Sequence, residues 1–293
     1  MKLSVRNKIL LASLASSLVR NLRGFAGLPS EGEFKRSGLS WDLDLREGID
    51  FSIWLLGAYE PDLAKCYENI LPRGATVLDV GANVGAHTLR LARAVGPSGR
   101  VHAFEPTGFA IGKLKRNLAL NPEVSQVVEA HHMFLGEKDS PDAPSEICAS
   151  WPLGSQPPGE LSEFCGLPQS TDGAVSMRLD TFVENARLQR IDFVKLDVDG
   201  HEAEVLAGGV KTIEQFYPDF VVELAPFVPQ ASGWSFGQLV SYFTDRGYSF
   251  HSITTGLSLP RQSDELLREI PAGTSLNVLA RHESRPSMNV DRS

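Results

Sequence analysis

Thr76-Val-Leu-Asp-Val-Gly-Ala-Asn-Val-Gly85, followed by Val101-His-Ala-Phe-Glu-Pro106, is the stretch that decides the fold of this chain. In both segments a short apolar run ends in a carboxylate, and the first run then enters a glycine turn and a helix-like sequence. Glycines let the backbone approach a ligand closely. A carboxylate at the tip of the next strand can accept hydrogen bonds from both hydroxyls of a ribose. The two segments therefore predict a β-α-β unit that binds an adenosine-containing cofactor.

The spacing of the glycines indicates which cofactor fits. The turn from Gly81 to Gly85 follows the pattern G-x-x-x-G, whereas a dinucleotide pyrophosphate is cradled by G-x-G-x-x-G. Asp79 places a negative charge just before the turn, where it would repel a phosphate and attract a cation. S-adenosylmethionine is such a cation, with a sulfonium group and an amino-acid tail. The turn favours a methyltransferase over a nicotinamide-dependent oxidoreductase, and the sequence also lacks a Tyr-x-x-x-Lys pair.

Length, charge and cysteine content narrow the class of protein. A chain of 293 residues is long enough for one large α/β domain with a well-buried core. The net charge of -8 provides no basic face for nucleic-acid phosphates, so we expect a small-molecule or saccharide acceptor and no nucleic acid. Cys66, Cys148 and Cys165 are odd in number and lack metal-type spacing, which fits free thiols in a reducing compartment.

Residues 1–28 form a separate segment in which basic residues flank the apolar stretch 9–19. This stretch is far shorter than the roughly 20 residues that span a bilayer. Its leucines at helical spacing predict an amphipathic helix that packs on the domain or makes weak contact with a membrane surface. Secretion is a third interpretation, but basic residues follow at once and no clean cleavage site is present. Cytoplasmic is the default location.

From residue 75 onward, strand-like and helix-like segments alternate, as in a parallel sheet covered by helices. Strands are expected at 77–80, 101–104, 124–130, 191–196, 219–223, 248–253 and 275–279, and helices at 87–95, 110–120, 202–216 and 236–246. Ahead of them, the pattern predicts a strand at 39–45 and one or two helices within 49–70. We therefore expect an α/β methyltransferase-type fold, with a mostly parallel seven-stranded sheet, an antiparallel pair at its end and helices on both faces.

The chain divides into an N-terminal helical or flexible segment (1–38), a methyltransferase domain (39–282) and a loose tail (283–293). The stretch 136–173 is rich in Pro, Ser, Gly and acidic residues and interrupts the alternation within the domain. A loop of this length is typical of a functional or a disordered segment. We interpret it as a lid over the substrate side, with a passive surface insertion as the alternative.

Carboxylates lie at or just after the ends of several predicted core strands: Asp79, Glu105, Asp197, Asp199 and Glu223. Each alone would be an ordinary solvated strand end, but ligands of open α/β sheets bind at this edge, so five together indicate a site. In Lys195-Leu-Asp-Val-Asp-Gly-His-Glu202, Asp199 could instead cap the next helix. Oxygen ligands suit Mg²⁺, but the spacing is not that of a calcium loop, and we predict no metal. His201 is a general-base candidate or a bystander.

Five motifs in a fixed order resemble those of the FkbM-type methyltransferases. They are Gly57-Ala-Tyr-Glu60, Val77-Leu-Asp-Val-Gly-Ala-Asn-Val-Gly85, Phe104-Glu-Pro106, Arg178-Leu-Asp-Thr-Phe182 and Lys195-Leu-Asp-Val-Asp-Gly-His-Glu-Ala-Glu-Val-Leu206. The resemblance covers roughly residues 39–227. It implies a Rossmann-like class I fold and S-adenosylmethionine-dependent methylation, usually of a hydroxyl on a sugar, polyketide or other small molecule.

The resemblance also implies roles for single residues. Those that would line the methionine part of the cofactor are Asp79, Gly81, Asn83 and Gly85. Glu105, with Pro106 beside it, would hold the ribose, and Glu60 would close the pocket from the front. A Lys-x-Asp-x-x-Gly-x-Glu signature beside the methyl donor is matched by Lys195, Asp197 and Glu202. Asp199 stands where the family more often has Glu, and the 136–173 insertion is longer than expected.

The expected reaction is an in-line transfer of the sulfonium methyl to a substrate oxygen, in which alignment and exclusion of water contribute most. Asp197 is the first candidate for the base, His201 is the second, and Lys195 is grouped with them as catalytic. Two alternatives stay open: a cofactor-binding module without catalytic activity and, less favoured, the nicotinamide-dependent oxidoreductase. The acceptor and the choice between oxygen and nitrogen are not specified by these residues.

Overall fold

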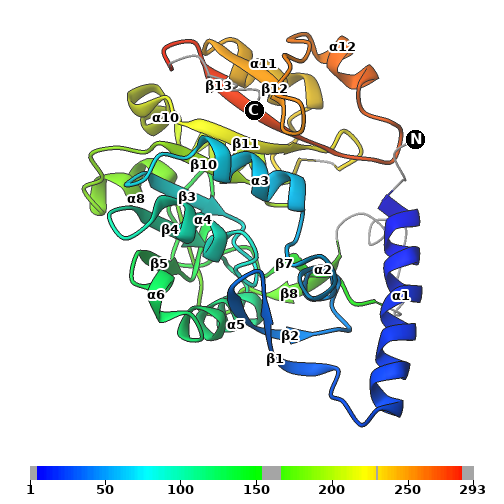
Figure 1. Cartoon of the computed structure of the whole chain (residues 1–293). Helices are drawn as coiled ribbons and strands as arrows, with labels where there is room; N and C mark the ends of the chain where they lie inside the picture. Colours follow the sequence, from blue (N-terminus) through cyan, green and yellow to red (C-terminus); the bar gives the residue numbers. More distant parts are fainter. Residues whose placement is uncertain (1–4, 154–165, 229, 286–293) are drawn as a thin grey trace.

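The computed structural model describes residues 5–153, 166–228 and 230–285. Cys165, the middle of the expected lid and most of the expected tail lie outside these ranges. A seven-stranded sheet in the order β12-β13-β11-β10-β3-β4-β5 forms the centre of the molecule (Figure 1). Its strands are β3 (Thr76–Val80), β4 (Arg100–Phe104), β5 (Val128–His131), β10 (Phe193–Leu196), β11 (Asp219–Leu224), β12 (Tyr248–Ser252) and β13 (Leu276–His282).

The sheet is parallel except at one edge, where β13 runs antiparallel to both β11 and β12. Successive residues of a strand point to opposite faces of the sheet, and in the central strands both faces are covered by a hydrophobic core. Val77 belongs to one hydrophobic core, and its neighbour Leu78 belongs to the other. This arrangement confirms the predicted fold, a mostly parallel seven-stranded α/β sheet between two helical layers.

Each core is closed by its own set of helices. The first set comprises α3 (Pro61–Ile70), α4 (Thr88–Val95) and α5 (Gly108–Ala119). The second comprises α8 (Leu179–Asn185), α9 (Glu202–Ala207), α10 (Val210–Phe216), α11 (Phe236–Thr244) and α12 (Ser263–Arg268). The loops that leave the carboxyl ends of β3, β4, β10 and β11 therefore emerge between two covered faces, at the edge where ligands of such sheets bind.

Two predicted elements differ from the observed ones, and one observed helix was not predicted. Residues 124–130 were expected to form one strand, but Pro122 opens a short helix, α6 (Pro122–Ser125), because proline suits the first helical position. The expected helix 202–216 is broken between α9 and α10 at Gly208, where a Cβ atom would lie 2.1 Å from the carbonyl oxygen of Gly136. Helix α12 has no counterpart among the predicted helices.

The N-terminal part begins with α1 (Val5–Phe25), which stands at one side of the molecule next to α2 (Gly48–Leu56) (Figure 1). Along the chain, α1 and α2 are connected by an antiparallel hairpin of β1 (Glu31–Arg36) and β2 (Leu39–Asp44). This hairpin spans the expected division at residue 38, and the division into domains remains a prediction. Among the described residues, no helix combines the length and the apolar character needed to cross a membrane.

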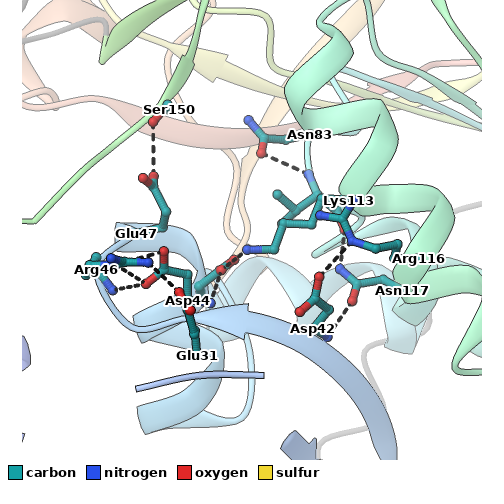
Figure 2. A network of polar contacts seen from close by, with 12 residues as sticks. Glu31, Asp42, Asp44, Arg46, Glu47, Asn83, Lys113, Arg116, Asn117 and Ser150 are labelled. Atoms are coloured by element: carbon teal, nitrogen blue, oxygen red, sulfur yellow. Dashed lines mark hydrogen bonds and ion pairs between the residues drawn. The ribbon is translucent and has the colours of Figure 1, made fainter. Parts of the chain in front are cut away.

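Polar side chains fasten this N-terminal part to α5 (Figure 2). Asn117 accepts a hydrogen bond from the amide of Asp42 at 2.7 Å, and the exposed Arg116 pairs with the Asp42 carboxylate at 2.8 Å. The ammonium of Lys113 pairs with Asp50 of α2, and both side chains are buried. Burial raises the pKa of Asp50 to about 6, against the opposing effect of Lys113. The hairpin and α2 are thus part of the same folded body as the sheet.

A pair of histidines between β4 and β5 makes the fold sensitive to acid. His102 Nδ1 lies 3.2 Å from His131 Nε2, and both rings pack against Phe182. Burial, together with His102, lowers the pKa of His131 to about 4. In this pH range the His131 side chain binds a proton in the unfolded chain but not in the folded chain. The free energy of unfolding therefore decreases as pH falls from 6.5 towards about 4.

We expect the variant His131→Gln to lose less stability than the wild type over this pH interval, because the residue no longer titrates. The measurement is the urea midpoint at the two ends of the interval. Equal losses of stability in the two proteins would contradict the assignment of the acid sensitivity to His131.

Candidate active site

The backbone of the glycine turn after β3 lies in close contact with the backbone that follows β10. Gly81 has a φ of +78°, and a Cβ atom there would lie 2.0 Å from the carbonyl oxygen of Asp197. Gly85 has a φ of +89°, but its missing side chain makes room for Leu114 of α5. It lines neither of the two cavities described below and has a packing role, and its predicted contact with the cofactor stays a prediction.

Lys195 lies under this turn and links the acidic strand ends. Its buried ammonium donates to the carbonyl of Gly81 at 2.9 Å and lies 3.3 Å from Asp197 Oδ2 and 3.8 Å from Asp79 Oδ1. Burial works against its charge, but Asp197 and Asp79 outweigh this effect and raise the pKa of Lys195 to about 12. Lys195 therefore keeps its proton, which excludes it as a general base at neutral pH.

Asp79 and Glu105 are buried carboxylates at the ends of neighbouring strands. Asp79 Oδ2 accepts from the hydroxyl of Thr88 at 2.6 Å, whereas Oδ1 has no hydrogen-bond partner. Glu105 Oε1 accepts from the hydroxyl and the amide of Thr107 at 2.6 and 2.8 Å, and Oε2 accepts from the amide of Asn83 at 3.0 Å. Burial raises the pKa of Glu105, while these hydrogen bonds oppose the rise. Oε1 already accepts two hydrogen bonds, whereas Oε2 accepts one and still has a lone pair available for a ligand hydroxyl.

Two cavities meet at this edge of the sheet and share four lining residues: Gly81, Asn83, Asp197 and Asp199. The smaller cavity, of about 50 Å³, contains Glu105, Pro106 and His201 in its wall. The larger one, of about 550 Å³, is lined by Glu60 and Lys195 and extends to α1. The structure thus brings together most of the predicted site residues, with Asp197 at the junction of the two cavities.

A cluster of three carboxylates occupies the wall of the larger cavity. Oxygen atoms of Asp197, Asp199 and Glu223 lie within 4.8 Å of one another, close enough for one divalent cation or a shared proton. Burial raises the pKa of Glu223 well above its ordinary value, and the nearby Asp197 and Glu60 carboxylates add to the rise. The environment of Glu223 therefore favours the neutral form of its carboxyl group, while the carboxylate of Asp197 is the member of the cluster that contacts Lys195.

Two predicted site residues have other partners. Glu202 is buried and lines neither cavity. Its carboxylate accepts from the amides of Val198 and Gly200 and from the side chain of Gln230 at 2.8 Å, so it braces the loop that carries Asp197. His201 reaches the smaller cavity, but its Nδ1 is hydrogen-bonded to Glu204. Glu202 thus supports the loop of Asp197, and its predicted contact with the cofactor stays a prediction.

The sequence analysis missed His87, which is buried in the wall of the larger cavity. The hydroxyl of Tyr67 lies 3.3 Å from His87 Nδ1, and burial holds the pKa of Tyr67 well above its ordinary value, so the phenol keeps its proton. On the other side of the ring, His87 Nε2 lies 3.6 Å from Glu60 Oε2. Glu60 also accepts from Asn277 at 2.8 Å. A motif-based search could not find this triad because its members are brought together only by folding.

Part of the expected lid forms a hairpin of β7 (Glu146–Ser150) and β8 (Leu167–Ser170) over the cavities. Asn83 of the glycine turn donates to the carbonyl of Ala149 at 3.0 Å. Glu47 accepts from the hydroxyl of Ser150 at 3.1 Å (Figure 2) and from the amide of Trp151 at 3.2 Å. The hairpin is therefore hydrogen-bonded both to the glycine turn and to Glu47, the residue that precedes α2. Its action as a lid remains a prediction.

The sheet order, the glycine turn and the acidic edge define a class I methyltransferase. The profile of the family described as Methyltransferase FkbM domain matches residues 79–250, which is more than half of the chain. The chain belongs to the FkbM family of S-adenosylmethionine-dependent methyltransferases, as its motifs predicted.

Curated relatives cover part of the chain. The 2-O-methyltransferase NoeI of Sinorhizobium fredii is 29% identical over 144 residues, which are 47% of this chain and 58% of that protein. Methyltransferase 1 of Beauveria bassiana is 30% identical over 165 residues, which are 49% of this chain and 62% of that protein. The chain thus spans about three fifths of the length of these relatives.

Among solved structures, a methyltransferase FkbM from Methylobacillus flagellatus superposes with a TM-score of 0.44 at 14% identity. The superposition covers 73% of this chain and 45% of that one. At this distance no residue role is transferred from it, and the roles of the site residues rest on their contacts in this chain.

Proposed function

We propose that this chain methylates a hydroxyl group of a small-molecule or saccharide acceptor with S-adenosylmethionine as the methyl donor. The observation that carries the proposal is the position of Asp197, which faces both cavities and is held by Lys195 at 3.3 Å. A carboxylate at this junction lies between the pocket beside Glu105 and the larger cavity available to an acceptor. The name of the relative NoeI, a 2-O-methyltransferase, supports oxygen as the methylated atom.

The residues present fit the cofactor. Glu105 offers a carboxylate for the ribose hydroxyls, and the close contact of Gly81 with Asp197 leaves a backbone cradle that any side chain would fill. Gly81 and Asn83 line both cavities and would flank the methionine end, whereas Asp79 lines neither cavity and lies 3.8 Å from the ammonium of Lys195. Glu60 lies across the larger cavity, where it would close the pocket. S-adenosylmethionine, when bound, supplies an electrophilic methyl group on a cationic sulfur.

In this proposal Asp197 accepts the proton of the acceptor hydroxyl. Lys195 keeps its own proton and orients Asp197, so it acts as a positioning residue. His201 is the weaker candidate for the base because its Nδ1 is engaged with Glu204 and it faces the smaller cavity. The larger cavity, with Trp151 and Leu167 in its wall, would surround the acceptor and exclude water, which strengthens the polar contacts inside.

Asp197→Asn is expected to lower kcat by about 10²- to 10⁴-fold, the usual contribution of a positioned base. The variant keeps the shape of the side chain, so binding of S-adenosylhomocysteine should be nearly unchanged. The assay measures S-adenosylhomocysteine released during incubation with a panel of hydroxyl-bearing sugars and small molecules. Full turnover by Asp197→Asn would remove the base assignment. Cofactor binding by the wild type without turnover of any acceptor would favour the module without catalytic activity.

A further inference from the structure

Helix α1 displays a row of large apolar side chains to solvent. We call this row the leucine stripe; it consists of Leu10, Leu11, Leu14, Leu18, Leu22 and Phe25. Its members are between 54% and 98% exposed and recur at the three- and four-residue spacing that places them on one side of a helix. A stripe of this kind is costly to leave in water, which raises the question of what covers it.

The opposite side of α1 is already held by the domain. The hydroxyl of Ser16 is buried and donates to the carbonyl of Leu45 at 2.6 Å. Ala12, Ala15 and Val19 pack against the small core of Leu45, Phe51 and Leu153. The orientation of α1 is therefore set by internal contacts, and the leucine stripe is the face that remains.

Exposed apolar side chains are concentrated in this region. Of the 13 large hydrophobic residues exposed in the described part of the chain, seven lie between Leu10 and Leu28. Two more, Leu55 and Leu56, lie on α2, the helix that α1 contacts. Single exposed leucines are ordinary on protein surfaces, but a contiguous group marks an interaction site.

The charge of α1 indicates the kind of surface that it meets. The helix contains Arg6, Lys8, Arg20 and Arg23 and no acidic residue, although the whole chain has a net charge of -8. Lys8 lines the larger cavity and Arg23 donates to the carbonyl of Pro29, so these two residues add to the positive charge of the helix without belonging to the leucine stripe. A second copy of the chain would bring two positively charged helices together, whereas anionic lipid headgroups would complement them. A basic amphipathic helix too polar to span a bilayer is typical of one that lies in the membrane interface.

We propose that α1 docks this protein on an anionic lipid surface, with the leucine stripe inserted at the boundary between headgroups and acyl chains. The inner side of the same helix contributes Lys8, Ile9 and Ala12 to the wall of the larger cavity. One helix diameter of about 10 Å then separates that cavity from the lipid. Docking does not depend on methyl transfer, because the leucine stripe lies on the far side of α1 from the cavity.

The test is co-sedimentation of the purified full chain with vesicles of phosphatidylcholine alone and of phosphatidylcholine mixed with phosphatidylglycerol. The wild type should bind the anionic vesicles more strongly, and added salt should weaken binding without abolishing it. The double variant L14E/L18E should lose at least about tenfold in the partition coefficient, because each change removes apolar insertion and adds a negative charge. The matched control is L257E, since Leu257 is 64% exposed but distant in sequence from α1.

Folding is checked by thermal unfolding and by calorimetry with S-adenosylhomocysteine, and L14S/L18S serves if the glutamate variant does not fold. The proposal is overturned if the wild type does not bind anionic vesicles. It is also overturned if the α1 variants bind these vesicles as strongly as L257E does. Equal binding to both vesicle types would overturn the anionic preference. A wild-type dimer that L14E/L18E converts to a monomer, without vesicle binding, would assign the leucine stripe to a second copy of the chain.

Discussion

Gly81→Ala is expected to destabilise the chain and to abolish binding of S-adenosylmethionine. The new Cβ atom would lie 2.0 Å from the carbonyl oxygen and 3.1 Å from the carbonyl carbon of Asp197. Both are backbone atoms of the loop that follows β10, so they cannot swing aside as the end of a flexible side chain could. The φ of +78° adds the strain of a left-handed alanine. Together these effects should cost about 2–5 kcal/mol in the free energy of unfolding.

Gly233→Ala is the matched control for this variant. Gly233 has a φ of +79°, and a Cβ atom there would meet nothing within 4 Å. Its replacement should cost only the strain of the left-handed conformation, about 1–2 kcal/mol, and leave cofactor binding intact. Urea unfolding and calorimetry with S-adenosylhomocysteine measure the two effects. If both variants lose the same stability and both still bind, the close approach of the turn to β10 has no role in the site.

Lys195→Met is expected to have the second largest effect. The ammonium of Lys195 is the cation between Asp79 and Asp197, and the Asp79 side chain is fully buried. Removing one partner of a buried ion pair leaves an uncompensated charge and typically costs about 3–5 kcal/mol. The variant also removes the hydrogen bond that the ammonium donates to the Gly81 carbonyl, so the glycine turn should become less well ordered. We therefore expect a large fall in the urea midpoint together with weaker cofactor binding.

Two further variants separate the buried charge from a general effect of losing a cation. Arg116→Met removes a pair with Asp42 whose Arg116 side chain is 61% exposed, and should cost at most about 1 kcal/mol. Asp79→Asn combined with Lys195→Met should recover part of the loss, because the unpaired carboxylate is gone. An unchanged urea midpoint for Lys195→Met would contradict this account of the site. So would a double variant whose loss of stability equals the sum of the losses in the two single variants.

The features predictable from the sequence were those encoded by neighbouring residues. The apolar run that ends at Asp79, the glycine turn and the lone Glu105 define one β-α-β unit within 30 residues, so their pattern sufficed to predict the fold and the position of the site. The acidic strand ends converged because parallel strands share one carboxyl edge. Glu223 was recognised as one of these ends, but its coupling to Asp197 depends on the distance between side chains in the folded chain.

The parts that could not be predicted depend on partners distant in sequence. The sequence pattern did not reveal that Gln230 and the amides of its own loop donate to the carboxylate of Glu202. Nor did it reveal that Leu114 fills the space beside Gly85. The amphipathic pattern of α1 predicted a helix, yet only the packing of Ser16 under Leu45 reveals which face is left outside.

The central claim is that the acidic edge of this sheet binds a cationic, ribose-bearing methyl donor through Glu105. Isothermal calorimetry with S-adenosylmethionine, S-adenosylhomocysteine and NAD, on the wild type and on Glu105→Gln, tests it directly. We predict binding of the first two ligands and none of NAD. The variant should bind at least about tenfold more weakly, because a hydrogen bond to a charged group is worth about 1.5–3 kcal/mol. No heat with either sulfur compound, or equal affinity after Glu105→Gln, would contradict the account.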